Sequence, residues 1–125
     1  MLQNFGMLDN NAILLTCSGA SNVGQMSHQA VVELAQEGFG KFFCLAGIGA
    51  HLDKFVQSAK NNPEVVVIDG CPVGCAKRIA EHAEVLISKY LVVTKLGLEK
   101  NYVLKTKEDE IEKVKLAVRN LYQER

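Results

Sequence analysis

Short apolar runs alternate along the chain with longer segments of mixed polarity. Residues 12–17 (AILLTC), 41–45 (KFFCL) and 65–69 (VVVID) are nearly continuous apolar runs, as expected of strands buried on both faces. A fourth strand is predicted at residues 90–95 (YLVVTK), before Gly97. The pattern therefore predicts a sheet of four mostly parallel strands.

Apolar residues recur at helical spacing after the first two runs. The first predicted helix begins at Ser21 or Asn22, either of which can cap it, and stops at Gly38. The second ends before Pro63. The predicted inward residues of these two helices are Val23, Met26, Ala30, Val31 and Leu34, and then Leu52, Phe55, Val56 and Ala59.

Two more helices are predicted in the second half of the chain. One covers residues 76–86, with Ile79, Ala83 and Leu86 facing inward. Residues 98–106 are irregular, with a short edge strand at 102–104. From Thr106 the letters TKED predict a capped final helix over about 107–123. Its predicted buried stripe is Ile111, Val114, Ala117, Val118 and Leu121.

This alternation of strands and helices predicts an α/β fold. We expect one three-layer, doubly wound domain over residues 1–125, flavodoxin-like or Rossmann-like, with helices on both faces of a four-stranded sheet in the order 2-1-3-4. In such sheets, ligands bind outside the carboxyl ends of the strands. Functional residues are therefore sought where the predicted strands end.

Composition narrows the classes of partner. A chain of 125 residues that is 48% apolar can bury a core of its own. Lys plus Arg equal Asp plus Glu at 14 each, so no basic field attracts nucleic acid, and we expect no nucleic-acid partner. The start MLQNFGMLDNN has no basic region, and no apolar run approaches the roughly 20 residues of a membrane span. We therefore expect a cytoplasmic protein without membrane association, and leave open a protein partner or a homodimer.

The four cysteines supply the candidate chemistry. Cys17, Cys44 and Cys71 are equally spaced, one strand and one helix apart, and each ends or follows a predicted strand; Cys75 follows closely. In a parallel sheet all four would converge at one edge. Clustered cysteines in a reducing cytosol are more often metal ligands or reactive thiols than disulfides. Four thiolates suit one Zn²⁺, and they also suit Fe or a [2Fe-2S] cluster.

Other residues near these thiols have predicted supporting roles. Asp69 is expected to accept hydrogen bonds from amides of the CPVGC loop, and Lys77 and Arg78 to balance the charge of the thiolates. His51 is predicted on the edge of the site, as an outer partner or a general base, whereas His28 and His82 are interpreted as mid-helix packing or surface residues. The glycines expected to bring backbone amides close to the sulfurs are Gly19, Gly24, Gly70 and Gly74.

Several segments carry a family resemblance. VVVIDGCPVGCAKRIAEHA, with CSGASNVG and FFCLAGIGAH before it and TKLGLEK after it, resembles the DGC domain family, small zinc-binding proteins named for an Asp-Gly-Cys motif that is here Asp69, Gly70 and Cys71. The resemblance covers about residues 12–100. It implies that the four cysteines chelate the metal, but no reaction, and it leaves Lys100 without an assigned role.

The expected function is zinc binding at the carboxyl edge of the sheet, in a sensor or an interaction module. One alternative is a thiol redox or sulfur-transfer enzyme that uses Cys71 or Cys75, and another is an iron or iron–sulfur redox protein with the same ligands. Whether the protein is an enzyme is left open. A phosphatase loop is disfavoured, because the clamping arginine is replaced by Val23 after Cys17 and by Lys77 after Cys71. Four protein ligands would also leave zinc no open position for hydrolysis.

Overall fold

The computed structural model describes residues 12–122. Its strands form one parallel sheet in the order β2-β1-β3-β4. The strands are β1 (Ile13–Thr16), β2 (Lys41–Phe42), β3 (Val65–Asp69) and β4 (Lys89–Val92). The predicted α/β fold, the parallel sheet and the strand order are confirmed.

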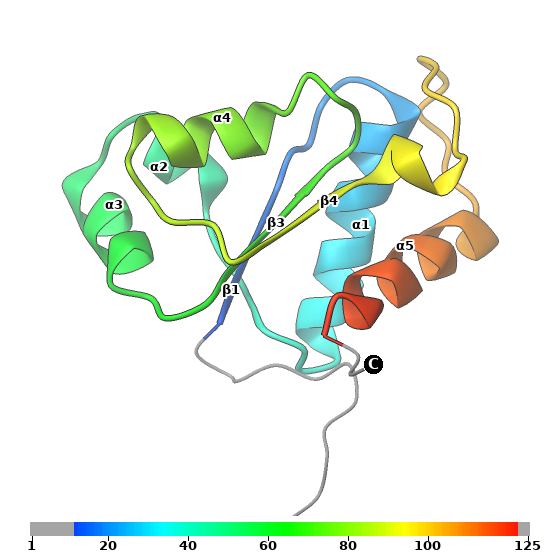
Figure 1. The fold of residues 1–125 in the computed structure, drawn as a ribbon. Coiled ribbons are helices and arrows are strands. Elements are labelled where there is room, and N and C mark those ends of the chain that lie inside the picture. Colours follow the sequence, from blue (N-terminus) through cyan, green and yellow to red (C-terminus); the bar gives the residue numbers. More distant parts are fainter. Residues whose placement is uncertain (1–11, 123–125) are drawn as a thin grey trace, which may run out of the picture.

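Helices cover both faces of this sheet. Within residues 12–122 the α-helices are α1 (Asn22–Gln36), α2 (Leu45–Gly49), α3 (Asp53–Lys60), α4 (Cys75–His82) and α5 (Glu108–Asn120). Figure 1 shows α1 and α5 on one face and α2, α3 and α4 on the other. The predicted three layers are therefore present.

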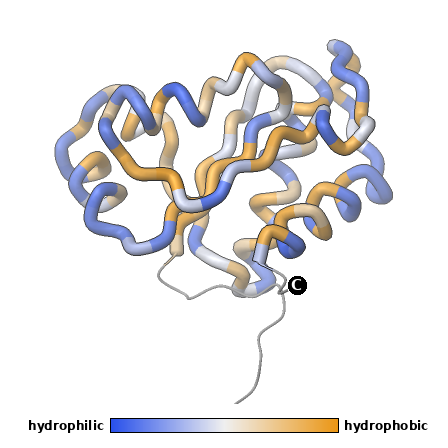
Figure 2. Tube along the Cα trace, in the orientation of Figure 1, coloured by the Kyte–Doolittle hydropathy of each residue, from blue (hydrophilic) through white to orange (hydrophobic). Residues whose placement is uncertain are grey.

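The strands divide their side chains between two apolar clusters. Leu14, Val66 and Ile68 belong to the cluster with α1 and α5, whereas Leu15 and Val67 belong to the cluster with α2, α3 and α4. In Figure 2 apolar positions dominate the central strands, and the helices alternate apolar and polar positions. This alternation places the core on both sides of the sheet, as in a doubly wound fold.

The first helix follows its sequence signals closely. The Ser21 side chain accepts a hydrogen bond from the Gly24 amide at 3.2 Å, which caps α1. Gly38 follows the helix with φ of +84°, a conformation that favours glycine. The predicted stripe is confirmed as buried: Val23, Met26, Ala30, Val31 and Leu34.

The second βα unit differs from the prediction. The strand ends at Phe42, and α2 begins at Leu45, so the predicted strand over 41–45 is wrong at its end. Two short helices replace the single predicted one, because Cys44 Sγ accepts the Gly47 amide at 3.3 Å and starts a helical turn early. Cys44 is consequently a helix cap and not the last residue of a strand.

The third helix and fourth strand are shorter than predicted. Helix α4 ends at His82, and the positive φ of Glu84 (61°) turns the chain, so that Val85 is buried and Leu86 is 88% exposed. The inward position predicted for Leu86 is wrong. Residues Val93–Leu96 form a 3₁₀ helix, so the predicted strand over 90–95 is wrong at its end; the Gly97 amide closes this turn by donating to the carbonyl of Thr94.

The segment before the last helix has no strand at residues 102–104, and the predicted edge strand is wrong. It is tied to α1 instead: the Asn22 side chain donates to the Glu99 carbonyl at 2.8 Å and accepts the Asn101 amide at 2.6 Å. These bonds attach residues 99–101 to the start of α1.

The final helix starts at Glu108. Lys107 precedes it without a side-chain cap, so the cap predicted at Thr106 is wrong; three acidic residues in the first turn favour the start through the helix dipole. Residue 123, its predicted end, lies outside the described residues. Of the predicted stripe, Ile111, Val114 and Val118 are buried, and Ala117 and Leu121 are half-buried. Within residues 12–122, no helix is both long and apolar enough to cross a membrane.

Candidate thiol site

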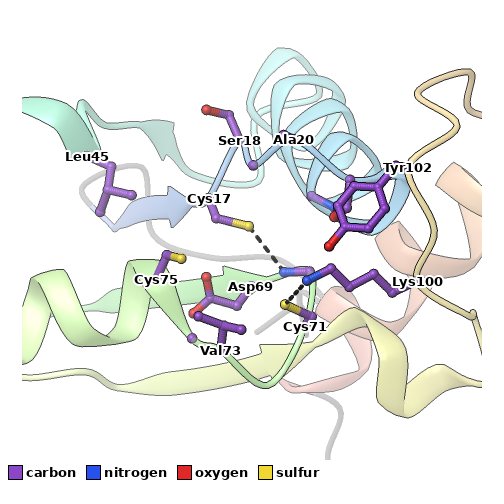
Figure 3. A pocket seen from close by; sticks show the side chains of 15 residues that line it. Cys17, Ser18, Ala20, Leu45, Asp69, Cys71, Val73, Cys75, Lys100 and Tyr102 are labelled. Carbon is purple, nitrogen blue, oxygen red and sulfur yellow. Dashed lines mark hydrogen bonds between the residues drawn. The ribbon is translucent and has the colours of Figure 1, made fainter.

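A cavity of about 330 Å³ lies beyond the carboxyl ends of β1 and β3. Three of the four cysteines line it: Cys17 from the end of β1, Cys71 from the turn after β3, and Cys75 from the first turn of α4. Figure 3 shows these side chains around the cavity, with Lys100 and Tyr102 on the side of Cys71. The expectation that the strand ends form the site is met for these three thiols.

Cys17 is the most deeply held of the thiols. Its side chain is buried, and Sγ accepts the Gly70 amide at 3.2 Å and lies 3.4 Å from the Ser27 hydroxyl oxygen. Burial raises the pKa of the Cys17 thiol, and the hydrogen bonds with Ser27 and Gly70 partly oppose that rise. The Cys17 sulfur is therefore held in place by hydrogen bonds from two different segments of the chain.

Close backbone contact explains why glycines surround this sulfur. A Cβ at Gly70 would lie 2.6 Å from the Gly24 nitrogen and the Val23 carbonyl carbon, and a Cβ at Gly24 would lie 2.9 Å from the Gly19 nitrogen. The turn after β3 thus lies directly on the start of α1. The predicted amide contact is confirmed at Gly70, whose N–H reaches Cys17 because no side chain intervenes.

Asp69 organises the start of α4. Its buried carboxylate accepts the Ala76 amide at 2.9 Å, the Lys77 amide at 3.0 Å and the Tyr90 hydroxyl at 2.9 Å. Burial, and then the bond to Asp69, raise the pKa of Tyr90 above its ordinary value. The predicted organising role is correct, although the amides belong to the first turn of α4 rather than to the CPVGC loop. Cys75 is positioned by this anchor.

Lys100 is a site residue to which the sequence assigned no role. Its ammonium donates to Cys71 Sγ at 3.4 Å, and this hydrogen bond raises the pKa of Lys100. The ammonium also lies 5.7 Å from the ring centre of Tyr102. The bonds between Asn22 and residues 99–101 bring this segment over the cavity. No local signal in the sequence predicts such a long-range contact.

Cys44 stands apart from the other three thiols. It is exposed at the start of α2, where it caps the helix through the Gly47 amide. The next residue, Leu45, lines the cavity. Cys44 is thus one residue removed from the cavity wall.

The sequence that forms this site matches a known protein family. The family model of the DGC domain matches residues 13–118. The chain belongs to the DGC domain family. The matched region extends past residue 100, where the segments that resemble the family end.

This DGC domain is similar to the anaerobic and virulence modulator AnvM of Pseudomonas aeruginosa. The two are 30% identical over 90 residues, which cover 72% of this chain and 69% of AnvM. No solved structure matches the chain.

The donor set can be tested against the zinc that the family resemblance implies. The four sulfurs of the DGC domain are free thiols, and soft thiolates suit zinc. As placed, however, no three His, Cys, Asp or Glu residues in the described part of the chain are grouped closely enough to hold a metal ion. The donors therefore fit zinc by chemistry, and their present positions do not form a closed site.

Three other predicted residues of this DGC domain, Lys77, Arg78 and His28, do not line the thiol cavity. The Lys77 ammonium lies over the Tyr90 ring at 5.2 Å, and Arg78 Nε donates to the Val73 carbonyl at 2.6 Å. His28 packs against Phe42 with 5.4 Å between ring centres, in agreement with a packing role.

The positions predicted for two histidines are wrong. His51 contacts His82 beyond the end of α2 and does not line the thiol cavity, because α2 carries the chain away from it. His82 ends α4 and is not mid-helix, but it is exposed, which agrees with the predicted surface role.

Proposed function

We propose that this DGC domain binds one zinc ion through the thiolates of Cys17, Cys44, Cys71 and Cys75, and acts as a sensor or an interaction module. The observation that carries the proposal is that three of these thiols line a single cavity although they come from two separate βα units. Thiols placed at random on the surface would rarely converge on one cavity.

The surroundings of the cavity support a negatively charged metal site. Four thiolates on one Zn²⁺ carry two net negative charges, which backbone amides and nearby cations stabilise. The Gly70 amide points at Cys17, and the Lys100 ammonium lies beside Cys71. Cys75 opens α4, where the helix dipole favours negative charge. Each of these groups acts on a different sulfur.

Cys44 gives the proposed site its regulatory character. A closed tetrahedral site requires Cys44 to approach the cavity, and therefore requires α2 to move. This helix has only five residues, so its own hydrogen bonds hold it weakly. Zinc binding would then be coupled to a shift of an exposed helix. A change of surface on metal binding is what a sensor or an interaction module needs.

The extensive apolar core indicates that the fold does not depend on zinc, which favours an exchangeable zinc ion over a structural one. Both faces of the sheet bear extensive buried clusters, and within residues 12–122 every buried side-chain nitrogen or oxygen has a hydrogen-bond partner. Small domains whose folding depends on zinc lack cores of this kind. We expect this domain to fold first and to bind the metal afterwards.

The test is metal content by elemental mass spectrometry, with an absorption spectrum, on tag-free protein purified without air or added metal. The expected result is one zinc per chain and a colourless solution. Cys17→Ser, Cys71→Ser and Cys75→Ser should abolish stoichiometric zinc, and Cys44→Ser should weaken its retention. Ser18→Ala, a change of an exposed residue of the same cavity, is the control and should keep the zinc.

Other outcomes would contradict the zinc proposal. Stoichiometric iron with visible charge-transfer bands would make the protein an iron or iron–sulfur redox protein with the same ligands. Protein that stays metal-free, and that takes up no zinc on dialysis against it, would remove the metal function altogether.

A second candidate function is thiol chemistry at Cys71, and the Lys100 contact favours it. An ammonium at 3.4 Å stabilises an anionic sulfur, which is the nucleophile of thiol–disulfide exchange and of sulfur transfer. In the exchange reaction, the Cys71 thiolate would attack a disulfide, form a mixed disulfide and release the other sulfur of that disulfide as a thiolate. Such a reaction needs no metal.

Alkylation kinetics distinguish the two candidates. For an enzyme, iodoacetamide should modify Cys71 of metal-free protein far faster than Cys44, which is also accessible, and Lys100→Met should slow the modification of Cys71. Tyr102→Phe, which keeps the aromatic ring beside Lys100, is the control. Equal rates at Cys71 and Cys44 would exclude the enzymatic candidate.

A further inference from the structure

Helices α2 and α4 each have a histidine at the end that lies away from the thiol cavity. Both helices begin at the thiol cavity, since Leu45 and Cys75 line it. At the other end, His51 follows α2 and His82 is the last residue of α4. Figure 1 shows the two helices side by side. A Cβ at Gly49 would lie 3.5 Å from the Ile79 side chain, an ordinary van der Waals distance, so the end of α2 packs against α4.

The two imidazoles face one another where these helices end. His51 Nε2 lies 3.1 Å from His82 Nδ1, and the ring centres are 5.0 Å apart. Two imidazole nitrogens on one metal ion, each at about 2.0–2.1 Å, are separated by about 3.3 Å in a tetrahedral site and by about 2.9 Å at a right angle. The measured separation lies between these values. The contact is a hydrogen bond between the two ring nitrogens, so sharing a metal ion requires the donor nitrogen to give up its proton and the rings to turn until both lone pairs face the ion.

The backbone of His51 ends α2 in the left-handed conformation that commonly follows a helix. Its φ is +58°, in the left-handed region that residues with a Cβ seldom occupy. The His51 amide donates to the Ile48 carbonyl at 2.9 Å, which holds the turn after α2. This conformation directs the ring toward α4 instead of continuing the path of the helix.

A cavity adjoins the imidazole pair and leaves room for further ligands of an ion. It has a volume of about 270 Å³ and is lined by Gly49, His51, Arg78, Ile79 and His82. Both rings are exposed, so an ion can enter from solvent without unfolding. The Arg78 guanidinium opposes a bare cation and attracts an anion, which favours an ion whose remaining positions carry water, hydroxide or a small carboxylate or phosphate.

We propose that His51 and His82 form a second metal site, separate from the thiol cavity, for a borderline divalent cation such as Zn²⁺ or Ni²⁺. Imidazole nitrogens suit these ions. With two protein ligands the site is weaker than a four-thiolate site. A bound ion would join the ends of α2 and α4, whose other ends carry Cys44 and Cys75, and would therefore restrict the movement of α2 relative to α4.

The experiment is a zinc titration of tag-free, reduced protein with ¹⁵N-labelled histidine rings, followed by nuclear magnetic resonance. Only three histidines contribute signals. The expected result is that His51 Nε2 and His82 Nδ1 shift together with one equivalent of zinc added beyond the amount that the thiols take up, while the ring of His28 stays unchanged. Zinc taken up by thiols does not mask this result, because each ring reports its own nitrogen.

Variants connect the shift to the pair. His82→Gln should weaken zinc binding at the remaining His51 ring, and His51→Asn, whose asparagine adopts the left-handed backbone readily, should do the same for His82. Losing a direct ligand costs at least as much affinity as losing an outer partner, so each loss should be roughly 10-fold or more. His28→Gln is the matched control and should leave both ring signals and their affinity unchanged.

The proposal is overturned if the His51 and His82 rings stay unshifted up to millimolar zinc, if His28 shifts in parallel with them, or if His82→Gln leaves the affinity at His51 unaltered. Its failure is distinguishable from failure of the thiol proposal. Metal content of the cysteine variants tests the sulfurs alone, and the ring signals test the imidazoles alone.

Discussion

The two helical layers on the sheet differ in length and in the side chains they carry. On one face, α1 and α5 have 15 and 13 residues; on the other, α2, α3 and α4 have 5, 8 and 8. The short layer carries Cys44, Cys75, His51 and His82. Segments that move on binding are drawn from the less stable parts of a fold. The comparison teaches that the long layer supplies stability, whereas the short layer carries two of the four thiols and the histidine pair.

An ion network reinforces the long layer. Lys115 on α5 is largely buried, and its ammonium contacts Glu33 at 3.1 Å and Glu37 at 2.5 Å on α1, and Glu112 at 3.3 Å on its own helix. The bond to Glu37 is the main reason why the pKa of Lys115 is raised, and it also lowers the pKa of Glu37. This network joins α1 to α5 in addition to their apolar contact.

The largest expected effect separates the two layers directly. Leu34 in the long layer and Ile48 in the short layer are both fully buried. Leu34→Ala should lower the free energy of unfolding by about 3 kcal/mol, because the long helices cannot collapse onto the cavity. Ile48→Ala should cost about 2 kcal/mol, because the short helices can. Urea denaturation measures both, and an equal or larger loss for Ile48→Ala would break the comparison.

A somewhat smaller effect is expected where the layers meet at the thiol cavity. Gly70→Ala should lower the free energy of unfolding by about 2–3 kcal/mol, because its Cβ meets backbone atoms of Val23 and Gly24 that cannot rotate away. It should also displace the amide that donates to Cys17.

Gly19→Ala is the control for this change, since a Cβ there has nothing within 4 Å, and it should stay close to wild type in thermal unfolding. Equal melting temperatures for the two variants would show that the turn after β3 is not held tightly.

Asp69→Asn tests how strongly the short layer is anchored to the sheet. In this variant the side-chain NH₂ group takes the place of one carboxylate oxygen and faces the backbone N–H of Ala76 or Lys77. That buried N–H then has no acceptor. The expected loss is about 2 kcal/mol in the free energy of unfolding. Amide hydrogen exchange should accelerate in α4 more than in α1, and Tyr90→Phe, which removes one partner of the carboxylate, should have the smaller effect of the two.

The smallest expected effect concerns the pH dependence of the long layer. Because the folded-state pKa of Glu37 is lowered, its contribution is present above the unfolded pKa of about 4.3 and is lost as pH falls through the folded value. Because the pKa of Lys115 is raised, its contribution is complete below about 10.4 and is lost at higher pH.

Lys115→Met should therefore cost about 1 kcal/mol at pH 7, discounted because the Glu33 and Glu37 side chains are 30% and 43% exposed. The difference from wild type should shrink at pH 3 in urea denaturation. Exposed Lys113→Met is the control. A loss for Lys115→Met that is independent of pH would mean that the residue contributes by its apolar stem alone.

Much of the fold was predictable because its signals are local. The strand runs of β1 and β3, the stripe of α1 and the Ser21 cap depend on residues close in the sequence, and they appear where expected. Leu86 shows where such reasoning fails. It has the spacing of an inward helical residue, but the helix ends earlier and the positive φ of Glu84 turns the chain, which leaves Leu86 in solvent.

The sequence by itself determined the parallel α/β sheet and the placing of Cys17 and Cys71 beyond neighbouring strands, because hydrophobic periodicity and the right-handed crossover follow from local chemistry. Only the tertiary structure decided that Cys44 caps a separate helix, that Lys100 reaches Cys71 and that His51 faces His82. These last two contacts join residues about 30 positions apart, and they depend on how helices and loops pack, for which the order of residues carries no periodic signal.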